Sequence, residues 1–286
     1  LLYCVKRKKF EKVIQKIQPK VILEVVSYNL DCMIFNEIAY EKKINTIELQ
    51  HGVMSGSIAY YYPKNVLIKQ FPQKVFLFSD YWKNCISVPL EDKNVISVGY
   101  PYFEEQVKKY QKINRDKNKT TKVILFLSQW TIGENFSKFA VEFSNLINDK
   151  WKIIYKLHPG EYSNWKKRYP WLANSGIEVV DSLRHNIYEY FAISNVQVGV
   201  SSTAIFEGLG FGLDTFIFNT VSAECMKQLC QDGFAAEVNS AKELADKLEK
   251  NIKSKKNKDK LFWKENAFNN LCVEINKCID STTACS

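Results

Sequence analysis

Two segments of the sequence end in residue types that bind phosphate groups. WKIIYKLHPGE (Trp151 to Glu161) brings Lys156 and His158 to the end of an apolar run. NVQVGVSSTAIFEGLGFG (Asn195 to Gly212) places three hydroxyls after a second apolar run, and a carboxylate one helical turn later: Ser201, Ser202, Thr203 and Glu207. A cation, hydroxyls at the start of a helix and a carboxylate together suit a nucleoside monophosphate or diphosphate with its ribose. The two segments therefore predict a nucleotide site.

Each of these residues also has a purely structural explanation. His158 could cap a turn while Pro159 ends the strand, and one hydroxyl could be the N-cap that Ser and Thr favour. Glu207 could be solvated or interact with the helix dipole. We favour binding because Lys156, His158 and Glu161 follow a buried strand together, and three hydroxyls exceed what a cap requires. Lys156 and His158 then stabilise phosphate charge, and Pro159 fixes the loop for backbone contacts to a base.

A second candidate site lies in the first half of the chain. His51 ends a strand in QHGVMSGS, whose small residues allow a ligand to approach the backbone. An imidazole there can act as general base on an acceptor hydroxyl or as a phosphate ligand, and a core or turn histidine is the alternative. Glu24 and Asp31 compete with it for the role of base. We expect His185 to be exposed or to cap a helix. A sugar-stacking wall is predicted from an aromatic cluster: Tyr60, Tyr61 and Tyr62.

Apolar runs alternate with amphipathic segments, which is typical of βαβ units. The predicted strands cover 21–26, 46–49, 74–78, 95–98, 122–127, 152–157, 178–180, 196–200 and 215–218. The predicted helices cover 8–17, 31–43, 134–147, 161–169, 186–191, 203–210, 223–230, 241–250 and 260–277. The polar segment 111–121 is the predicted linker. The pattern predicts an α/β protein with two Rossmann-like domains, 1–112 and 121–286, facing each other across a cleft, with ligands at the strand ends.

Composition limits the class of protein. Among the 286 residues, 46% are apolar and 25% charged, as in an ordinary soluble protein. No apolar run approaches the roughly 20 residues needed to span a bilayer, and basic residues follow Leu1 to Val5, the reverse of the order in a secretory signal. The eight cysteines are scattered without a C-x-x-C pair, so we expect no zinc site, no disulfide framework and a reducing cytoplasm.

The net charge of +9 predicts an anionic partner. A phosphorylated substrate and an anionic membrane surface both fit, whereas no nucleic-acid motif is present. The lysine-rich segment from Asn251 to Lys260 could rest on anionic lipid, and a solvated charge run is the alternative.

The strand running into HPGE and the strand running into SSTAIFEGLGFG resemble the nucleotide-binding half of bacterial GT-B glycosyltransferases. The similar group includes CMP-sugar sialyltransferases, capsule Kdo transferases and CDP-glycerol glycerophosphotransferases of teichoic acid synthesis. In those families a His-Pro pair and a Ser-Ser or Ser-Thr pair hold the nucleotide, which implies that role for His158, Pro159, Ser201 and Ser202. LQHGV resembles their His-Gly element, which implies a catalytic role for His51. Residues 79–104 resemble the segment that precedes the interdomain linker.

The resemblance covers most of residues 45–240 and implies an inverting, metal-independent glycosyltransferase of bacterial surface-glycan synthesis, such as capsule or lipopolysaccharide. Its donor is a CMP-, CDP- or UDP-linked sugar, with no other cofactor, and its acceptor is a glycan or lipid-linked hydroxyl, reached in the cytoplasm or on the inner face of the membrane. The sequence departs from the family pattern in two ways. The N-terminal domain lacks the first strand and the glycine-rich loop of the pattern, and the acidic motif of sialyltransferases is not evident. Transfer of a polyol phosphate, an epimerase and a non-catalytic nucleotide-sugar-binding subunit stay open as alternatives.

Overall fold

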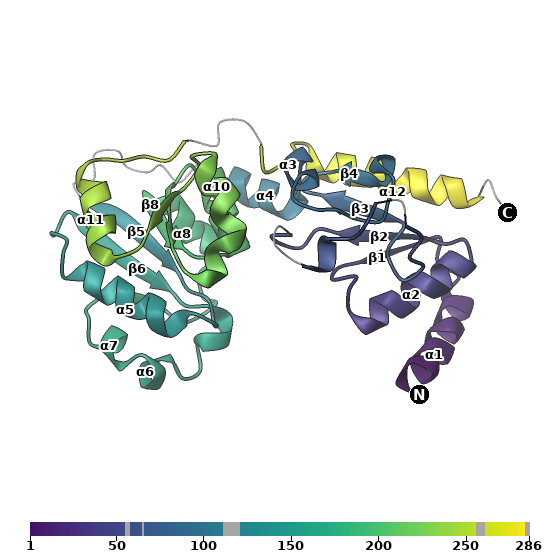
Figure 1. Ribbon diagram of the computed structural model, residues 1–286, viewed down its shortest axis with the longest axis horizontal. Helices are drawn as coiled ribbons and strands as arrows, with labels where there is room; N and C mark the ends of the chain where they lie inside the picture. Colours follow the sequence, from purple (N-terminus) through teal and green to yellow (C-terminus); the bar gives the residue numbers. More distant parts are fainter. Residues whose placement is uncertain (55–57, 65, 111–120, 256–260, 284–286) are drawn as a thin grey trace. The chain divides into compact units, whose positions relative to one another are not determined.

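The computed structural model describes residues 1–54, 58–64, 66–110, 121–255 and 261–283. The chain forms two compact units, which we call unit 1 (Leu1–Glu104 with Lys260–Ser286) and unit 2 (Glu105–Asp259). Each unit is built on one parallel β-sheet with helices packed against it (Figure 1). The predicted α/β class with Rossmann-like domains is therefore confirmed.

Unit 1 contains a four-stranded sheet in the order β1-β2-β3-β4. Its strands are β1 (Val21–Glu24), β2 (Asn45–Leu49), β3 (Lys74–Leu77) and β4 (Val95–Ser97). Its helices are α1 (Leu2–Ile17), α2 (Leu30–Glu41), α3 (Asp80–Lys83), α12 (Ala267–Thr283) and the first part of α4 (Pro101–Tyr110), with 3-10 turns η1 (Ile58–Tyr60) and η2 (Asp92–Asn94). The inner strands β2 and β3 are short and mostly buried, as strands covered by helices must be, whereas the edge strand β1 is only partly buried, with Leu23 45% exposed.

The C-terminal helix belongs to unit 1, although it follows unit 2 in the sequence. Leu271, Ile275 and Cys278 of α12 pack against Ile47 and Phe76 of the sheet. The side-chain amide of Asn45 also donates a hydrogen bond to the carbonyl of Cys278, at 2.9 Å. The boundary thus differs from the predicted domain 121–286, because the apolar face of α12 completes the core of the first sheet. Residues 111–120 of the predicted linker lie outside the described residues, as do residues 256–260 of the lysine-rich segment.

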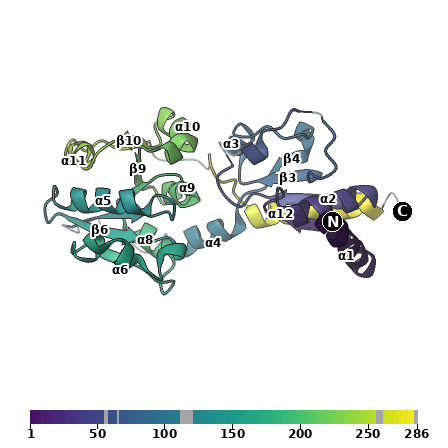
Figure 2. The same cartoon turned by 60° about the horizontal axis from the view of Figure 1, so that its bottom comes forward.

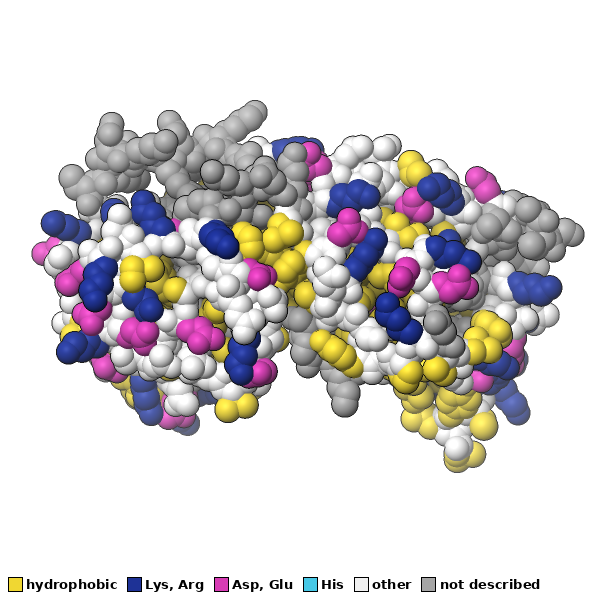
Figure 3. Space-filling view, turned by 45° about the horizontal axis from the view of Figure 1, so that its top comes forward, with side chains coloured by type: hydrophobic (Ala, Val, Ile, Leu, Met, Phe, Trp, Pro, Cys, Tyr) yellow, Lys and Arg dark blue, Asp and Glu magenta, His cyan; other side chains and the backbone are white. Residues whose placement is uncertain are grey.

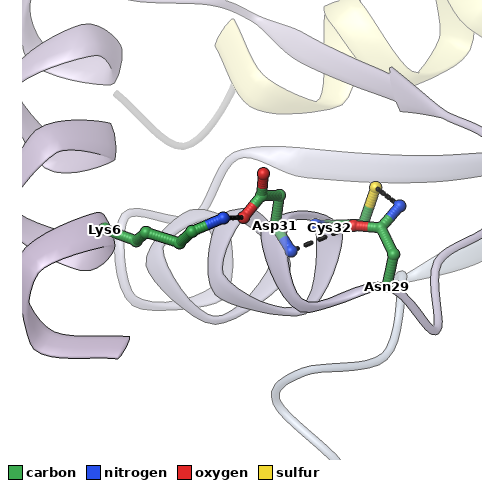
Figure 4. A network of polar contacts seen from close by, with 4 residues as sticks. All are labelled: Lys6, Asn29, Asp31 and Cys32. Atoms are coloured by element: carbon green, nitrogen blue, oxygen red, sulfur yellow. Dashed lines mark hydrogen bonds and ion pairs between the residues drawn. The ribbon is translucent and has the colours of Figure 1, made fainter. Parts of the chain in front are cut away.

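Helices α1 and α2 are joined by a polar network at the start of α2 (Figure 4). The side chain of Asn29 caps α2 by accepting hydrogen bonds from the N–H groups of Asp31 and Cys32, both at 2.9 Å. The carboxylate of Asp31 pairs with the ammonium of Lys6 on α1. Asp31 therefore serves a structural contact, which weakens its case as a catalytic base.

Unit 2 contains a six-stranded sheet in the order β10-β9-β8-β5-β6-β7. The strands are β5 (Lys122–Leu127), β6 (Trp151–Lys156), β7 (Glu178–Val180), β8 (Val196–Gly199), β9 (Asp214–Phe218) and β10 (Ala236–Val238). Counted along the chain, this is the doubly wound order 3-2-1-4-5-6. The chain reverses its direction across the sheet between β5 and β8, and such a switch point leaves a crevice at the carboxyl ends of the two strands.

Helices cover both faces of the unit 2 sheet (Figure 2). They are α5 (Gly133–Ser144), α6 (Trp165–Arg168), α7 (Pro170–Ala173), α8 (Ile187–Ile193), α9 (Thr203–Gly210), α10 (Lys227–Gln231) and α11 (Ala241–Glu249), with 3-10 turns η3 (Pro159–Glu161) and η4 (Val221–Met226). On the α5 face, Phe126 packs against Phe136, Phe139 and Phe143. Right-handed crossovers place α8 and α9 on the opposite face, next to the switch point.

Charged side chains of both signs are interspersed over the face drawn in Figure 3. This distribution agrees with the sequence, in which the basic residues are spread among many elements. Within the described part of the chain, no helix has the length and apolarity needed to cross a bilayer.

Candidate functional site

Unit 2 has a cavity of about 680 Å³ at the switch point of its sheet. Its wall comes from Ser128 after β5, from residues 157–159 after β6, from residues 183–187 after β7, and from Ser202 and Ala204 at the start of α9. Lys109 and Tyr110 at the end of α4 complete it. His158 and Ser202 were predicted to share one site, and both line this cavity. The strands that carry them are not direct neighbours, because β5 lies between β6 and β8.

His158 is held by a capping box around η3. The ring nitrogen Nδ1 of His158 accepts a hydrogen bond from the backbone N–H of Gly160 at 3.1 Å. The backbone N–H of His158 donates to the carboxylate of Glu161 at 2.8 Å. The hydroxyl of Tyr169 donates to the other oxygen of Glu161, also at 2.8 Å, and Glu161 is only 1% exposed. Because Nδ1 is an acceptor, the ring carries its proton on Nε2. His158 therefore presents an N–H donor, with Pro159 beside it on the cavity wall.

Lys156 ends β6 at the base of the cavity and is only 8% exposed. Its ammonium donates to the hydroxyl of Tyr162 and, at 3.2 Å, to the carbonyl of Leu157. Burial lowers the pKa of Lys156, while the negative charges of Asp181 and Glu161 act in the opposite direction. A poorly hydrated cation of this kind attracts an anion more strongly than an exposed lysine does.

Ser202 is the N-cap of α9, and its hydroxyl accepts a hydrogen bond from the N–H of Ala204 at 3.2 Å. The N–H and hydroxyl of Ser201 both donate to the side-chain oxygen of Gln129, at 3.0 and 3.1 Å. Gln129 thereby joins the end of β8 to the loop after β5, a role that the sequence analysis missed. Of the three predicted hydroxyls, Ser202 is the one on the cavity wall, whereas Ser201 and Thr203 are its chain neighbours.

Glu207 lies on α9 beyond the first turn, and it is not among the described residues that line the cavity. Its side chain is 9% exposed and hydrogen-bonded to Tyr188. Burial raises the pKa of Glu207 to about 7. Its predicted contact with the nucleotide therefore stays a prediction.

His185 was expected to be exposed or capping, and its side chain is indeed 54% exposed. It also lies on the cavity wall, which was not predicted. Its Nδ1 lies 2.9 Å from the carboxylate of Glu189, one turn into α8. That carboxylate also accepts from the N–H of Asn186 at 3.3 Å and from the hydroxyl of Tyr110 at 3.4 Å. The sequence signal was the four-residue spacing of His185 and Glu189 around the N-cap Asn186. Arg184 lines the cavity next to them.

The cavity has an excess of positive charge. Lys109, Lys156 and Arg184 line it, and Glu189 is the acidic residue among the described lining residues. Together with the N–H donor of His158 and the N-terminus of α9, these groups can bind a phosphate or diphosphate. No group of three potential metal ligands occurs within the described ranges.

The first-unit candidate His51 is exposed and follows β2 in the sequence. The buried side chain of Gln50 fixes the turn before it, because it donates to the carbonyl of Gly52 at 2.9 Å and accepts from the N–H of Phe78 at 2.8 Å. The backbone at His51 is thus held by the side chain of Gln50. The catalytic role of His51 stays a prediction.

The predicted sugar-stacking wall is wrong for Tyr60. This side chain is 2% exposed, and its hydroxyl donates to the buried carboxylate of Glu48 at 2.7 Å. Tyr60 is interior because Glu48, on a central strand, needs buried donors for its oxygens. Tyr61 is 55% exposed, and the ring of Tyr62 packs edge-on against Phe71. Sugar contact by these two residues stays a prediction.

Glu24, the other candidate base, ends β1 beside Glu48 of β2. Burial raises the pKa of Glu24 to about 7, and the amide of Asn36 donates to its carboxyl at 2.8 Å. A carboxyl that titrates near neutral pH fits a proton acceptor at that pH. Because one of its oxygens is shielded from solvent without a hydrogen-bond partner, Glu24 as placed is poorly disposed to meet a substrate.

The fold is shared with solved structures that include a UDP-GlcNAc 2-epimerase, a glycosyltransferase and a wall teichoic acid polymerase. The UDP-GlcNAc 2-epimerase of Methanocaldococcus jannaschii, in complex with UDP-GlcNAc and UDP, aligns with a TM-score of 0.62 at 15% identity over 96% of this chain and 80% of that chain. A glycosyltransferase of Rickettsia africae aligns with a TM-score of 0.54 at 17% identity over 99% and 80%. The wall teichoic acid polymerase TagF, soaked with CDPG, aligns with a TM-score of 0.53 at 14% identity over 84% and 68%. No protein-family model and no curated protein sequence matches the chain. These similarities establish a GT-B-like fold.

Proposed function

We propose that the protein is an enzyme that binds a nucleotide-activated sugar in the cavity of unit 2 and transfers the sugar to an acceptor hydroxyl. The observation that carries the proposal is the cationic cavity at the switch point of a doubly wound sheet, where open α/β proteins bind their ligands. The similar structures include a UDP-GlcNAc enzyme with UDP in its complex and a polymerase soaked with CDPG, which supports a nucleotide ligand.

In this proposal each group has a separate task. Lys156 and the Nε2–H of His158 stabilise the phosphate that leaves with the nucleotide, and Ser202 with the first turn of α9 binds another phosphate oxygen. These groups supply the charge that a metal ion provides in other transferases. His51 accepts the proton of the attacking hydroxyl, whose oxygen bonds to the anomeric carbon as the bond to the nucleotide phosphate breaks; this single displacement inverts the sugar. Tyr61 contributes to the acceptor side.

The proposed acceptor is a bacterial surface glycan or its lipid-linked precursor. The protein then works in the cytoplasm or at the inner face of the cytoplasmic membrane. The net charge of +9 favours contact with the anionic lipids of that face. Transfer of a polyol phosphate from a CDP donor uses the same phosphate-binding groups and differs in the group that moves.

The experiment that tests the proposal separates binding from turnover. The protein is incubated with UDP-, CDP- and CMP-linked donors and acceptor glycans, and nucleotide release is followed in the wild type and in His51→Ala. We expect the variant to bind nucleotide with unchanged affinity and to lose at least about 100-fold in turnover, as removal of a general base does. Equal turnover in the two proteins contradicts the assignment of His51, and binding without any turnover indicates a non-catalytic subunit.

A second candidate, epimerisation of a nucleotide sugar, is favoured by the TM-scores of 0.62 to 0.66 for several UDP-GlcNAc 2-epimerases. An epimerase acts without an acceptor. Incubation with UDP-GlcNAc alone, followed by separation of the two epimers, therefore tests it. Conversion without acceptor supports epimerisation, and binding of UDP-GlcNAc without conversion contradicts epimerisation of this sugar.

A further inference from the structure

Two histidines line the same cavity, and the structure holds their rings in opposite ways. His158 uses Nδ1 to accept a hydrogen bond from the N–H of Gly160 at 3.1 Å. His185 directs Nδ1 at the carboxylate of Glu189 at 2.9 Å. Because an ionised carboxylate only accepts hydrogen bonds, Nδ1 of His185 carries a proton and its Nε2 is the nitrogen left for a ligand. His158 can donate to a phosphate as a neutral ring, whereas His185 can donate through Nε2 only after it gains a second proton.

Glu189 is a partly exposed carboxylate, 38% exposed, that several neighbouring groups hydrogen-bond. The N–H of Asn186 and the hydroxyl of Tyr110 donate to one of its oxygens, while His185 lies at the other. Burial acts to raise the pKa of Glu189, but the hydrogen bonds from His185, Asn186 and Tyr110 outweigh burial and lower it. The carboxylate is therefore ionised at neutral pH and lies 2.9 Å from Nδ1 of His185, whose side chain is 54% exposed.

The charges around His185 oppose one another. Glu189 favours a second proton on the imidazole, whereas Lys109, Arg184 and Lys156 line the same cavity and disfavour it. Among the described residues, Tyr110 and His158 are further ionisable groups on the cavity wall, and the ring of Tyr190 lies edge-on to His185 at 6.3 Å. A bound diphosphate adds negative charge within this set, and the balance then moves toward the imidazolium.

We propose that His185 takes up a proton when the cavity binds a nucleotide diphosphate, and that its imidazolium then holds a phosphate oxygen beside Lys156 and His158. The inference rests on the proposed function, because it needs a nucleotide in this cavity. The proton comes from solvent, Nε2 gains it, and no covalent bond of the nucleotide changes. His185 makes nucleotide binding tighter as the pH falls through the range in which imidazoles titrate.

The test is isothermal titration calorimetry of UDP and CDP at pH 7 in two buffers that differ in ionisation enthalpy. The difference in apparent binding enthalpy gives the number of protons taken up. We expect a measurable uptake in the wild type and a smaller one in His185→Asn. The variant His158→Asn is the matched control, because Asn keeps the N-cap. It should bind more weakly with unchanged proton uptake.

A second measurement follows the dissociation constant between pH 7.5 and 5.5. We expect the ratio of wild-type to His185→Asn affinity to rise about tenfold toward the lower pH, the value of a hydrogen bond to a charged group. The comparison with the variant cancels the titration of the phosphate itself. Nucleotide binding with equal proton uptake in wild type and His185→Asn overturns this inference and leaves the proposed function standing. Failure of UDP and CDP to bind at any pH overturns the proposed function as well.

Discussion

The substitution Glu161→Gln tests how the His158 loop is held. Glu161 is 1% exposed and accepts two hydrogen bonds, from the N–H of His158 at 2.8 Å and from the hydroxyl of Tyr169 at 2.8 Å. In glutamine one of the two oxygens becomes an NH₂ group, which cannot accept. One buried donor is then left without a partner, and the other loses a charged acceptor.

The magnitude follows from these two bonds. A buried donor left unsatisfied costs about 1–3 kcal/mol, and a bond to a charged group contributes about 1.5–3 kcal/mol, part of which a neutral acceptor retains. We therefore expect Glu161→Gln to lower the free energy of unfolding of unit 2 by about 3 kcal/mol. For a domain of about 150 residues this corresponds to a fall in Tm of roughly 6–12 °C. Nucleotide affinity should fall as well, because His158 loses its position.

The assay is differential scanning calorimetry together with nucleotide titration. Glu134→Gln is the matched control, because the Glu134 carboxylate is exposed and pairs with the surface residue Lys138, at 2.7 Å. It should melt with the wild type. If the Tm of Glu161→Gln lies within about 1 °C of the wild-type Tm, the loss of free energy is well below the expected value. Together with unchanged nucleotide affinity, that result refutes the proposed support of His158 by Glu161.

Three further substitutions test buried groups. In the wild type, folded Glu207 keeps its proton over a pH range in which the unfolded chain has released it, so the wild type loses stability as the pH rises from 4.5 to about 7. The free energy of unfolding of Glu207→Gln, measured in urea, should therefore rise relative to the wild type by about 3 kcal/mol over that range. A constant difference contradicts the raised pKa. Gly133→Ala would place a Cβ 2.1 Å from Glu161 and should lower the free energy of unfolding by about 1–3 kcal/mol, whereas an unchanged Tm would show that the site relaxes freely. Tyr60→Phe leaves Glu48 with one donor fewer and should lower the free energy of unfolding by about 1–3 kcal/mol in the same assay; no loss would contradict the buried hydrogen bond.

The strands of the sheets could be predicted because their apolar runs are short and bounded by turn residues. The predicted strand 152–157 matches β6 (Trp151–Lys156), and 122–127 matches β5. Helices were predicted less well where side-chain contacts interrupt them. The predicted helix 161–169 is instead the end of η3 followed by the four-residue α6, because the Glu161 side chain turns inward to bond His158 and Tyr169. The three-residue strand β10 is too short to produce a periodic signal.

The candidate site could be predicted where its residues follow a strand directly. Lys156, His158 and Ser202 belong to this group. The exposure of His185 was predicted, but its place on the cavity wall was missed, because the spacing of His185 and Glu189 indicates a helix start and not which surface of the sheet that start adjoins. Gln129 was missed because its bonds to Ser201 join segments 72 residues apart in the sequence. Tyr60 was misplaced because aromatic composition alone cannot separate an exposed stacking surface from a buried hydrogen-bond donor.

The measurement that tests the central claim most directly is nucleotide binding to a protein whose cavity has been filled. Ala204 lines the cavity at the start of α9, so Ala204→Phe blocks it without removing the Ser202 cap. Ala173→Phe, at an exposed alanine of α7, is the matched control. We predict that UDP or CDP raises the Tm of the wild type and of Ala173→Phe with increasing concentration, and that Ala204→Phe shows no such shift. An equal shift in all three proteins would place the nucleotide elsewhere and contradict the account.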